Sequence, residues 1–294
     1  MEILNISKSK FASLTSMEIP KEVTNTEAQM FLMDTHKGLK VVKKLHILNG
    51  EKFANKLYTL EMLNEMRDCL PNNLIIPDAL LAVNGNIMGF TMPYVYGTNL
   101  SSILNNRKID PKQCIYYLKQ IGYILEQLQK IRTNSPLKDF YINDLHEGNI
   151  IVNKYNEGIS IIDLDSCKIG TNDTSEAKYT TDYSLASKLD YKYKKNTEGG
   201  RGYLKADQNT DMYCYVITIL NYLFGENINN WTIEDYFNYL DYLNYLGYNS
   251  ELLEIFRKIT YNCENDNPVG YLDTISPEQV YRANKKIYQL NRNK

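Results

Sequence analysis

The chain lacks a strong charge of either sign. Lys and Arg together number 33 and Asp and Glu 35 among its 294 residues, which leaves a formal net charge of −2. Proteins that bind nucleic acid or anionic lipid as a main function usually present a basic surface, so we expect neither partner. No apolar run approaches the roughly 20 residues of a membrane-spanning helix, and no membrane association is expected.

Paired cysteines are missing as well. The five cysteines are widely spaced and none forms a C-x-x-C pair, which argues against a zinc site and against a disulfide framework. Reduced thiols are the ordinary state in the cytosol. The first residues, MEILNISKSKFASL, show neither the basic start nor the apolar core of an export signal, so we expect a cytoplasmic protein.

The first ninety or so residues are dominated by strand patterns. Short β-rich runs cover 27–34, 38–47, 79–83 and 87–95, and the turn sequences THKG and NGN predict two hairpins between them. In the segment 49–66 the apolar residues recur at helical spacing, which predicts one helix between the two hairpins.

Beyond the run YGTNL the pattern becomes helical. Asp110-Pro111 is a typical helix start, the segment 210–225 is apolar on nearly every face, as in a core helix, and 231–294 predicts further helices. The sequence therefore predicts an α+β protein. A small antiparallel β-sheet lobe with one helix occupies 1–93, and a larger, mostly helical lobe occupies 94–294.

Polar residues interrupt the apolar pattern in YINDLHEGNIIVN, residues 141–153. A turn aspartate capping its own backbone and a catalytic or metal-binding loop are both compatible with this stretch. Phosphoryl transfer from ATP requires a carboxylate that orients the attacking hydroxyl and hard oxygen ligands for Mg²⁺. Asp144 and Asn149, five positions apart (149 − 144), and Asp163 after the apolar run ISII could supply these groups.

A cation that positions the phosphates is also needed, and Lys43 at the end of LKVVK is the candidate. Strand alternation places Lys43 and Lys44 on opposite faces and does not choose between them. Glu61 on the following helix, 18 positions later (61 − 43), could orient the lysine. Glu65, one turn further on the same face, is the alternative.

In their order along the chain, these segments resemble the motifs of the protein-kinase-like superfamily. NDLHEGNIIV resembles the catalytic loop, IIDLD the metal-binding segment, KVVKKL the strand with the phosphate-positioning lysine, and FTMPYVYGTNL the hinge. TDMYCYVITILNYLFG resembles the buried helix that follows the activation segment. The resemblance covers about residues 20–225 and implies a bilobal protein-kinase-like fold with ATP and Mg²⁺ as cofactors.

The resemblance also implies roles for individual residues. Asp144 would be the catalytic base and Met92 the gatekeeper, while the Pro93 carbonyl and the Val95 amide would meet adenine. The expected site residues fall into four groups: catalytic (Asp144 and His146), ATP-binding (Lys43, Glu61, Met92, Pro93 and Val95), metal-binding (Asn149 and Asp163), and supporting the loop backbone (Asp211).

Several positions depart from the protein-kinase pattern. The chain contains no G-x-G-x-x-G motif. Its first glycine is Gly38, and the turn that corresponds to the glycine-rich loop would lie near 24–29. Asn143 replaces the arginine of H-R-D, and Asp165 replaces the glycine of D-F-G. His146 gives the loop the D-L-H-x-x-N form of aminoglycoside- and choline-kinase-like enzymes, as a phosphate contact or as a structural donor. The A-P-E segment is not recognisable in GGRGYLKADQNTD.

Taken together, the motifs favour an ATP- and Mg²⁺-dependent phosphotransferase, most similar to protein Ser/Thr kinases. Its acceptor would be a hydroxyl group of a protein or of a small molecule. Two alternatives remain: a small-molecule kinase of the aminoglycoside- or choline-kinase type, and a pseudokinase that senses nucleotide or binds a partner without turnover.

Overall fold

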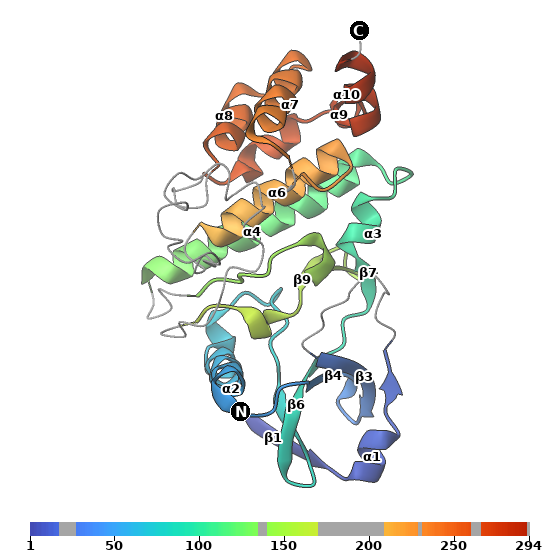
Figure 1. Cartoon of the computed structure of the whole chain (residues 1–294), viewed down its shortest axis with the longest axis vertical. Coiled ribbons are helices and arrows are strands. Elements are labelled where there is room, and N and C mark those ends of the chain that lie inside the picture. The colour runs from blue at the N-terminus through green and yellow to red at the C-terminus, as the bar shows by residue number, and fades with distance from the viewer. Residues whose placement is uncertain (18–27, 135–139, 170–208, 229–230, 260–265, 293–294) are drawn as a thin grey trace.

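The chain folds into a β-rich part and a helical part (Figure 1), in agreement with the predicted fold class. The computed structural model describes residues 1–17, 28–134, 140–169, 209–228, 231–259 and 266–292. Residues 24–27 of the expected turn at 24–29 and most of GGRGYLKADQNTD lie outside the described residues, and residues 28 and 29 belong to strand β3. Strand β6 ends at Pro93, and the lobe boundary expected after this residue stays a prediction.

The β-rich part is a six-stranded sheet in the order β1-β5-β6-β4-β3-β2. Two hairpins form where the sequence predicted them, β3–β4 and β5–β6. The prediction of an antiparallel sheet is wrong for one pair, since β1 runs parallel to β5 with Glu2 opposite Ala79. The strand bounds are β1 Glu2–Ile6, β2 Thr15–Ser16, β3 Ala28–Thr35, β4 Gly38–Leu45, β5 Ala79–Val83 and β6 Asn86–Pro93.

Both faces of this sheet are covered. Helix α2, Gly50–Glu65, packs on one face through Leu60, in a cluster with Leu45 and Phe90. On the other face, Phe11 of α1, Lys8–Ala12, packs against a cluster that contains Val42. Because apolar side chains alternate along the central strand β4, the sheet contributes to two separate small cores.

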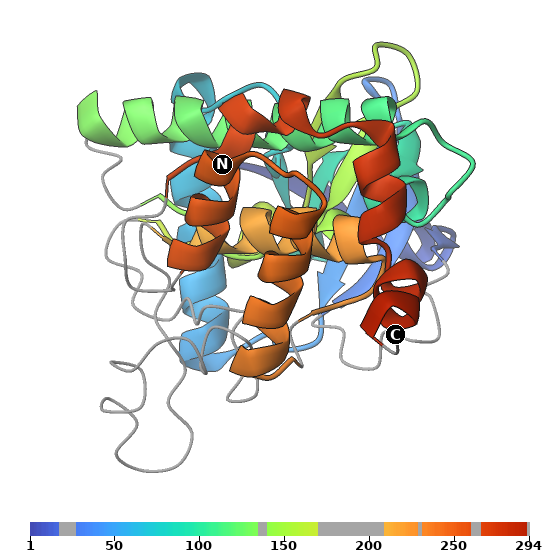
Figure 2. The same ribbon diagram turned by 90° about the horizontal axis from the view of Figure 1, so that it is seen from above.

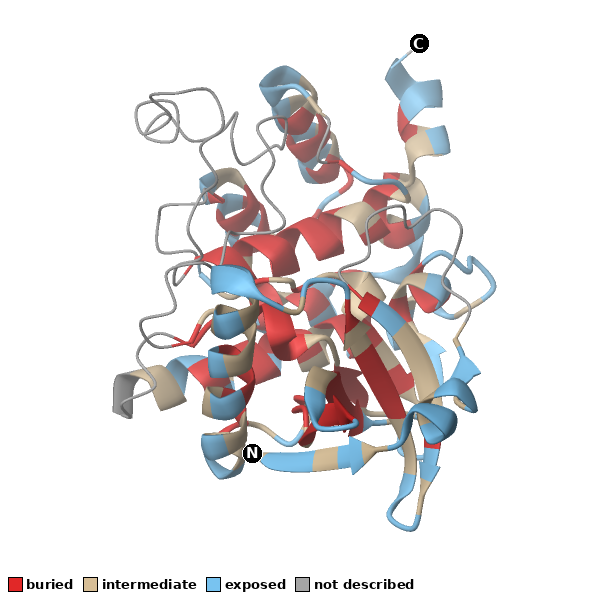
Figure 3. Cartoon of the chain, turned by 60° about the horizontal axis from the view of Figure 1, so that its bottom comes forward, coloured by how far each residue is buried: buried red, intermediate tan, exposed pale blue. Residues whose placement is uncertain are grey.

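The helical part surrounds α6, Thr210–Phe224, which is buried along nearly its whole length (Figure 3). Helix α4, Pro111–Asn134, lies beside it, and the later helices cover the side away from the sheet (Figure 2). Those are α7 Ile233–Tyr245, α8 Ser250–Lys258, the 3₁₀ segment η5 Pro268–Thr274, α9 Pro277–Ala283 and α10 Lys285–Arg292. Within the described part, no helix combines the length and the apolar character needed to cross a membrane.

A small second sheet lies between the two parts. Its order is β7-β8-β9, with all neighbours antiparallel. It places the loop that precedes β8 and the turn that follows β9 on the side of the sheet-bearing part (Figure 1). The remaining bounds are η1 Arg67–Cys69, β7 Gly97–Asn99, α3 Leu100–Leu104, η2 Glu147–Asn149, β8 Ile150–Asn153, β9 Ile159–Ile161 and η3 Leu164–Ser166.

Candidate active site

The two neighbouring lysines of β4 lie on opposite faces of the sheet. Lys43 is on the α2 face, where its Nζ pairs with Asp163 and donates to Asp165 Oδ1 at 2.8 Å. Lys44 is on the other face, with its Nζ 5.7 Å from the centre of the Phe11 ring. Of these two lysines, Lys43 is therefore the one that lies beside Asp163 and Asp165.

Glu61 does not lie where the resemblance placed it. It is exposed on α2, as is Glu65, and in the described part of the chain the carboxylates that pair with Lys43 are those of Asp163 and Asp165. The expectation that Glu61 orients Lys43 is thus not met in this structure. The face of α2 toward Lys43 carries a second lysine, Lys56, whose Nζ lies 2.9 Å from Asp165 Oδ2.

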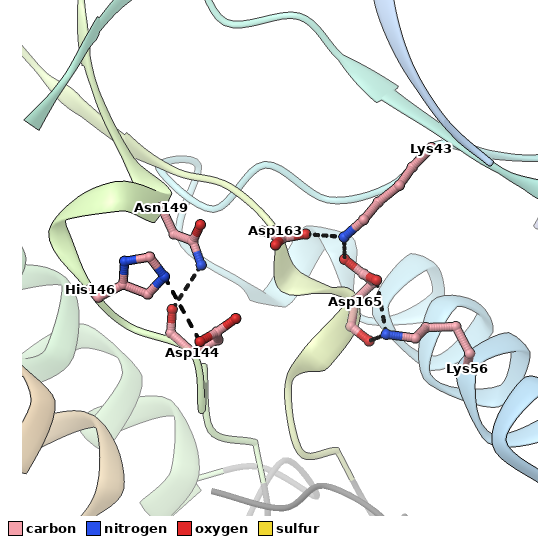
Figure 4. Close-up of polar contacts among 7 residues, drawn as sticks. All are labelled: Lys43, Lys56, Asp144, His146, Asn149, Asp163 and Asp165. Atoms are coloured by element: carbon pink, nitrogen blue, oxygen red, sulfur yellow. Dashed lines mark hydrogen bonds and ion pairs between the residues drawn. The ribbon is translucent and has the colours of Figure 1, made fainter. Parts of the chain in front are cut away.

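Asp163 and Asp165 lie in a tight turn that follows β9. Asp163 has left-handed backbone angles, φ 65° and ψ 39°, and begins the 3₁₀ turn η3. A non-glycine residue rarely adopts this region, where a side chain costs of order 1 kcal/mol. The turn aims both carboxylates at Lys43 (Figure 4), so the strained backbone serves to converge charged groups.

The two carboxyl groups differ in their electrostatic surroundings. Burial raises the pKa of Asp163 to about 6, against the opposing effect of Lys43. Burial also disfavours the ionised form of Asp165, but Lys43 and Lys56 together hold the pKa of that carboxyl well below its ordinary value. For Lys43, burial acts to lower the pKa, and the two aspartates overcome it and raise the pKa. Asp165 is therefore the more acidic of the two carboxyl groups beside Lys43.

A buried carboxylate accepts hydrogen bonds from the backbone of the loop that carries Asp144. Asp211, at the start of α6, accepts the backbone N–H groups of Ile142 at 2.9 Å and of Asn143 at 2.8 Å. Arg132 of α4 donates to the same carboxylate at 3.1 Å and to the Phe140 carbonyl at 2.7 Å. The hydrogen bonds that the sequence predicted from Asp211 to the loop backbone are present.

Asn143, which stands at the arginine position of the kinase loop, shapes the turn before Asp144. Its φ is +66°, and the Asp144 N–H donates to the Ile142 carbonyl at 2.8 Å, which closes a classical γ-turn. The buried Asn143 Nδ2 donates to the Ser166 carbonyl at 3.0 Å. Asn143 thus connects the loop to the turn that carries Asp163 and Asp165.

Asp144, His146 and Asn149 lie together on the other side of the site (Figure 4). Asn149 Nδ2 donates to the Asp144 carbonyl at 3.0 Å. His146 Nδ1 accepts the Gly148 N–H at 3.0 Å, so the neutral ring carries its proton on Nε2, which lies 3.9 Å from Asp144 Oδ1. His146 therefore has a structural task in the loop and also faces the carboxylate of Asp144.

The pairing of β8 with β9 places the segment that ends at Asn149 beside the segment that leads to Asp163. Ile150 pairs with Ile161, and the Ile162 N–H donates to the Asn149 carbonyl at 2.9 Å. Asn149 and Asp163 consequently lie on adjacent segments, with side chains on facing sides of the gap in Figure 4. One amide oxygen and one carboxylate suit Mg²⁺, which commonly takes few protein ligands and completes its shell with phosphates and water.

The described part of the chain does not by itself provide a complete set of metal ligands. Among the described residues, no three His, Cys, Asp or Glu side chains form a group that could hold a metal ion. A metal at Asn149 and Asp163 would therefore depend on a phosphate ligand for further coordination.

The expected hinge residues lie at the end of β6 and directly after it. Met92 is buried opposite Val41 of β4, and Pro93 is exposed at the last position of the strand. The Tyr94 N–H donates to the Leu39 carbonyl at 3.1 Å, which leaves half-buried Val95 as the next backbone donor along the segment. Adenine contacts by Pro93 and Val95 stay a prediction.

Lys56 was not predicted as a site residue from the sequence, and no role was predicted for Asp165. A signal for Lys56 was present, because it occupies the face of the 49–66 helix defined by Phe53, Leu57 and Leu60. A lysine on an apolar helix face requires a buried partner. The two aspartates of IIDLD, Asp163 and Asp165, also indicated that Lys43 alone would not balance the charge of this turn.

The fold matches those of solved protein kinase domains. The kinase domain of maize SIRK1 (sucrose-induced receptor kinase 1), bound to AMP-PNP, has a TM-score of 0.59 and 12% sequence identity; the match covers 95% of this chain and 96% of that one. The PknI kinase domain of Mycobacterium tuberculosis has a TM-score of 0.55 and 11% identity, over 92% of this chain and 94% of that one. No protein-family model and no curated protein sequence matches the chain. The chain therefore has the protein-kinase-like fold that its motifs implied.

Proposed function

We propose that the protein is a Mg²⁺-dependent phosphotransferase that transfers the γ-phosphoryl group of ATP to a hydroxyl. The observation that carries the proposal is the convergence on one gap of a lysine from β4, a loop carboxylate and an amide–carboxylate pair (Figure 4). Phosphoryl transfer is catalysed mainly by positioning and electrostatic stabilisation, and these are the functions such groups perform. The AMP-PNP bound by the maize kinase domain supports a nucleotide site in this fold.

Each residue has one task in this mechanism. Lys43 neutralises the phosphates. Asn149 and Asp163 would hold Mg²⁺, which would offset the negative charge of the phosphates. Asp144 accepts the proton of the attacking hydroxyl. Asp211 fixes the backbone on which Asp144 is mounted, through the two N–H groups that precede it.

We favour a protein serine or threonine as the acceptor, because the hinge, the lysine-bearing strand and the buried α6 resemble those of protein kinases. One observation favours a small-molecule acceptor instead. His146, with its Nε2 turned toward Asp144, occupies the position that gives the loop its aminoglycoside- and choline-kinase-like form.

The test is an incubation with γ-labelled ATP and Mg²⁺, offering generic protein and small hydroxyl compounds as acceptors. The Asp144→Ala variant is expected to lose about a hundredfold or more in turnover, the range for a general base, and to retain nucleotide binding. The Asp273→Asn variant is the control, since Asp273 pairs with Lys119 on the exposed side of η5.

Thermal shifts with ATP, with and without Mg²⁺, separate the alternatives. A shift without transfer to any acceptor would favour a nucleotide-sensing pseudokinase. The absence of a shift under both conditions, or full activity in Asp144→Ala, would contradict the proposal.

A further inference from the structure

Asp165 occupies the position of the glycine in the D-F-G motif of kinases. Its carboxylate nevertheless lies at the centre of the ion pairs that join Lys43 and Lys56 to this turn. Its side chain is only 1% exposed and accepts hydrogen bonds from two lysines on different elements. Oδ1 receives Lys43 of β4 at 2.8 Å, and Oδ2 receives Lys56 of α2 at 2.9 Å. A buried carboxylate requires such partners, because burial without them costs several kcal/mol.

Lys56 contacts the turn at two points. Besides the carboxylate, its Nζ donates to the Asp165 backbone carbonyl at 2.9 Å. The side chain leaves α2 from the face that also carries buried Leu60, so its position is fixed by the packing of the helix. Lys56 thus holds the Asp165 side chain in one orientation and couples α2 to the 163–165 turn.

We propose that the Asp165–Lys56 pair orients Lys43 toward the nucleotide phosphates, the task that the sequence resemblance gave to Glu61. The inference rests on the proposed function. Lys43 contacts two carboxylates, Asp163 and Asp165, and a metal ion would engage the first of them. Asp165 then remains as the partner that keeps Lys43 in place.

Lys56 places a second cation beside Asp165. The Lys43 ammonium is therefore not the only group that offsets the charge of this carboxylate.

The test compares Asp165→Asn, Lys56→Met and Lys56→Arg, with Lys52→Met as the matched control. Lys52 is an exposed lysine one turn earlier on the same helix. The readouts are ATP affinity with and without Mg²⁺ by calorimetry, KM and kcat for ATP, and thermal unfolding. Positioning predicts a higher KM for ATP at temperatures far below unfolding, which a purely structural role would not produce.

Asp165→Asn is expected to weaken ATP binding about tenfold or more, as for a lost charge-assisted contact. Lys56→Met should weaken it several-fold, Lys56→Arg should restore most of the affinity, and Lys52→Met should match the wild type. If Asp165→Asn fails to fold, the test is the comparison of ATP affinity between Lys56→Met and Lys56→Arg. Equal affinities in these two variants would overturn the inference.

The failure of this inference differs from the failure of the proposed function. A wild type that binds ATP, together with an Asp165→Asn variant of equal affinity and an impaired Glu61→Gln variant, would overturn the inference alone. A wild type that neither binds nor turns over ATP would overturn the proposed function and this inference with it.

Discussion

Asp211 and Asn143, 68 positions apart (211 − 143), are joined by a buried hydrogen bond of 2.8 Å from the Asn143 N–H to Asp211 Oδ1. The bond connects the first turn of the central helix to the residue directly before the proposed base. The position of Asp144 is therefore set by the core of the helical part as much as by its own loop.

The Asp211→Ala variant is expected to lose on the order of 3 kcal/mol of unfolding free energy, because it leaves Arg132 and two backbone N–H groups without their buried acceptor. Urea unfolding measures the loss. Asp273→Ala, which removes an exposed carboxylate paired with Lys119, should cost less than about 1 kcal/mol. Equal losses in the two variants would contradict the role given to Asp211.

The neighbouring lysines of β4 provide a second comparison. Lys43→Met removes the cation at the site, and a charge-assisted hydrogen bond of about 1.5–3 kcal/mol corresponds to a tenfold to hundredfold weaker binding of ATP. Lys44→Met changes the opposite face of the sheet, beside Phe11, and should leave the affinity unchanged. Calorimetric titration of both variants with Mg²⁺ and ATP is the measurement, and a stronger effect of Lys44→Met would refute the assignment.

Gly89 allows β6 to lie close to β4 at the site lysine. A Cβ atom at this position would lie 2.0 Å from the Lys43 carbonyl oxygen, so Gly89→Ala must displace one of the two strands. We expect a loss of about 2 kcal/mol, typical of overpacking, and weaker ATP binding through the displaced lysine. Gly270→Ala is the control, since nothing lies within 4 Å of its added Cβ, and thermal unfolding should leave it within about 0.5 kcal/mol of the wild type.

The parts that the sequence predicted are those determined by local pattern. The hairpins around THKG and NGN and the buried helix at 210–224 follow from apolar periodicity and turn residues. The parallel pairing of β1 with β5 could not be predicted in this way, because it joins segments 77 positions apart (79 − 2) and depends on the completed sheet.

The site shows the same division. The relation of Asp144 to Asn149 was readable because both lie on one loop. Lys43 was favoured over Lys44 by the resemblance alone, because strand alternation does not say which face of the sheet carries the site. The partner of Lys43 was misassigned because spacing along the helix favoured Glu61, whereas the rotation of α2 presents Lys56 to the site. The direction of a helix face depends on tertiary packing, which spacing from the strand does not report.

The parallel strand β1 also has a consequence for solubility. Strand β5 is buried along its whole length, and β1 covers the edge that β6 leaves free. A chain without residues 1–6 would present an apolar strand edge with unpaired backbone groups, the kind of template on which proteins associate edge to edge. The short, largely exposed β1 (Figure 3) thus keeps the backbone groups of this apolar edge paired.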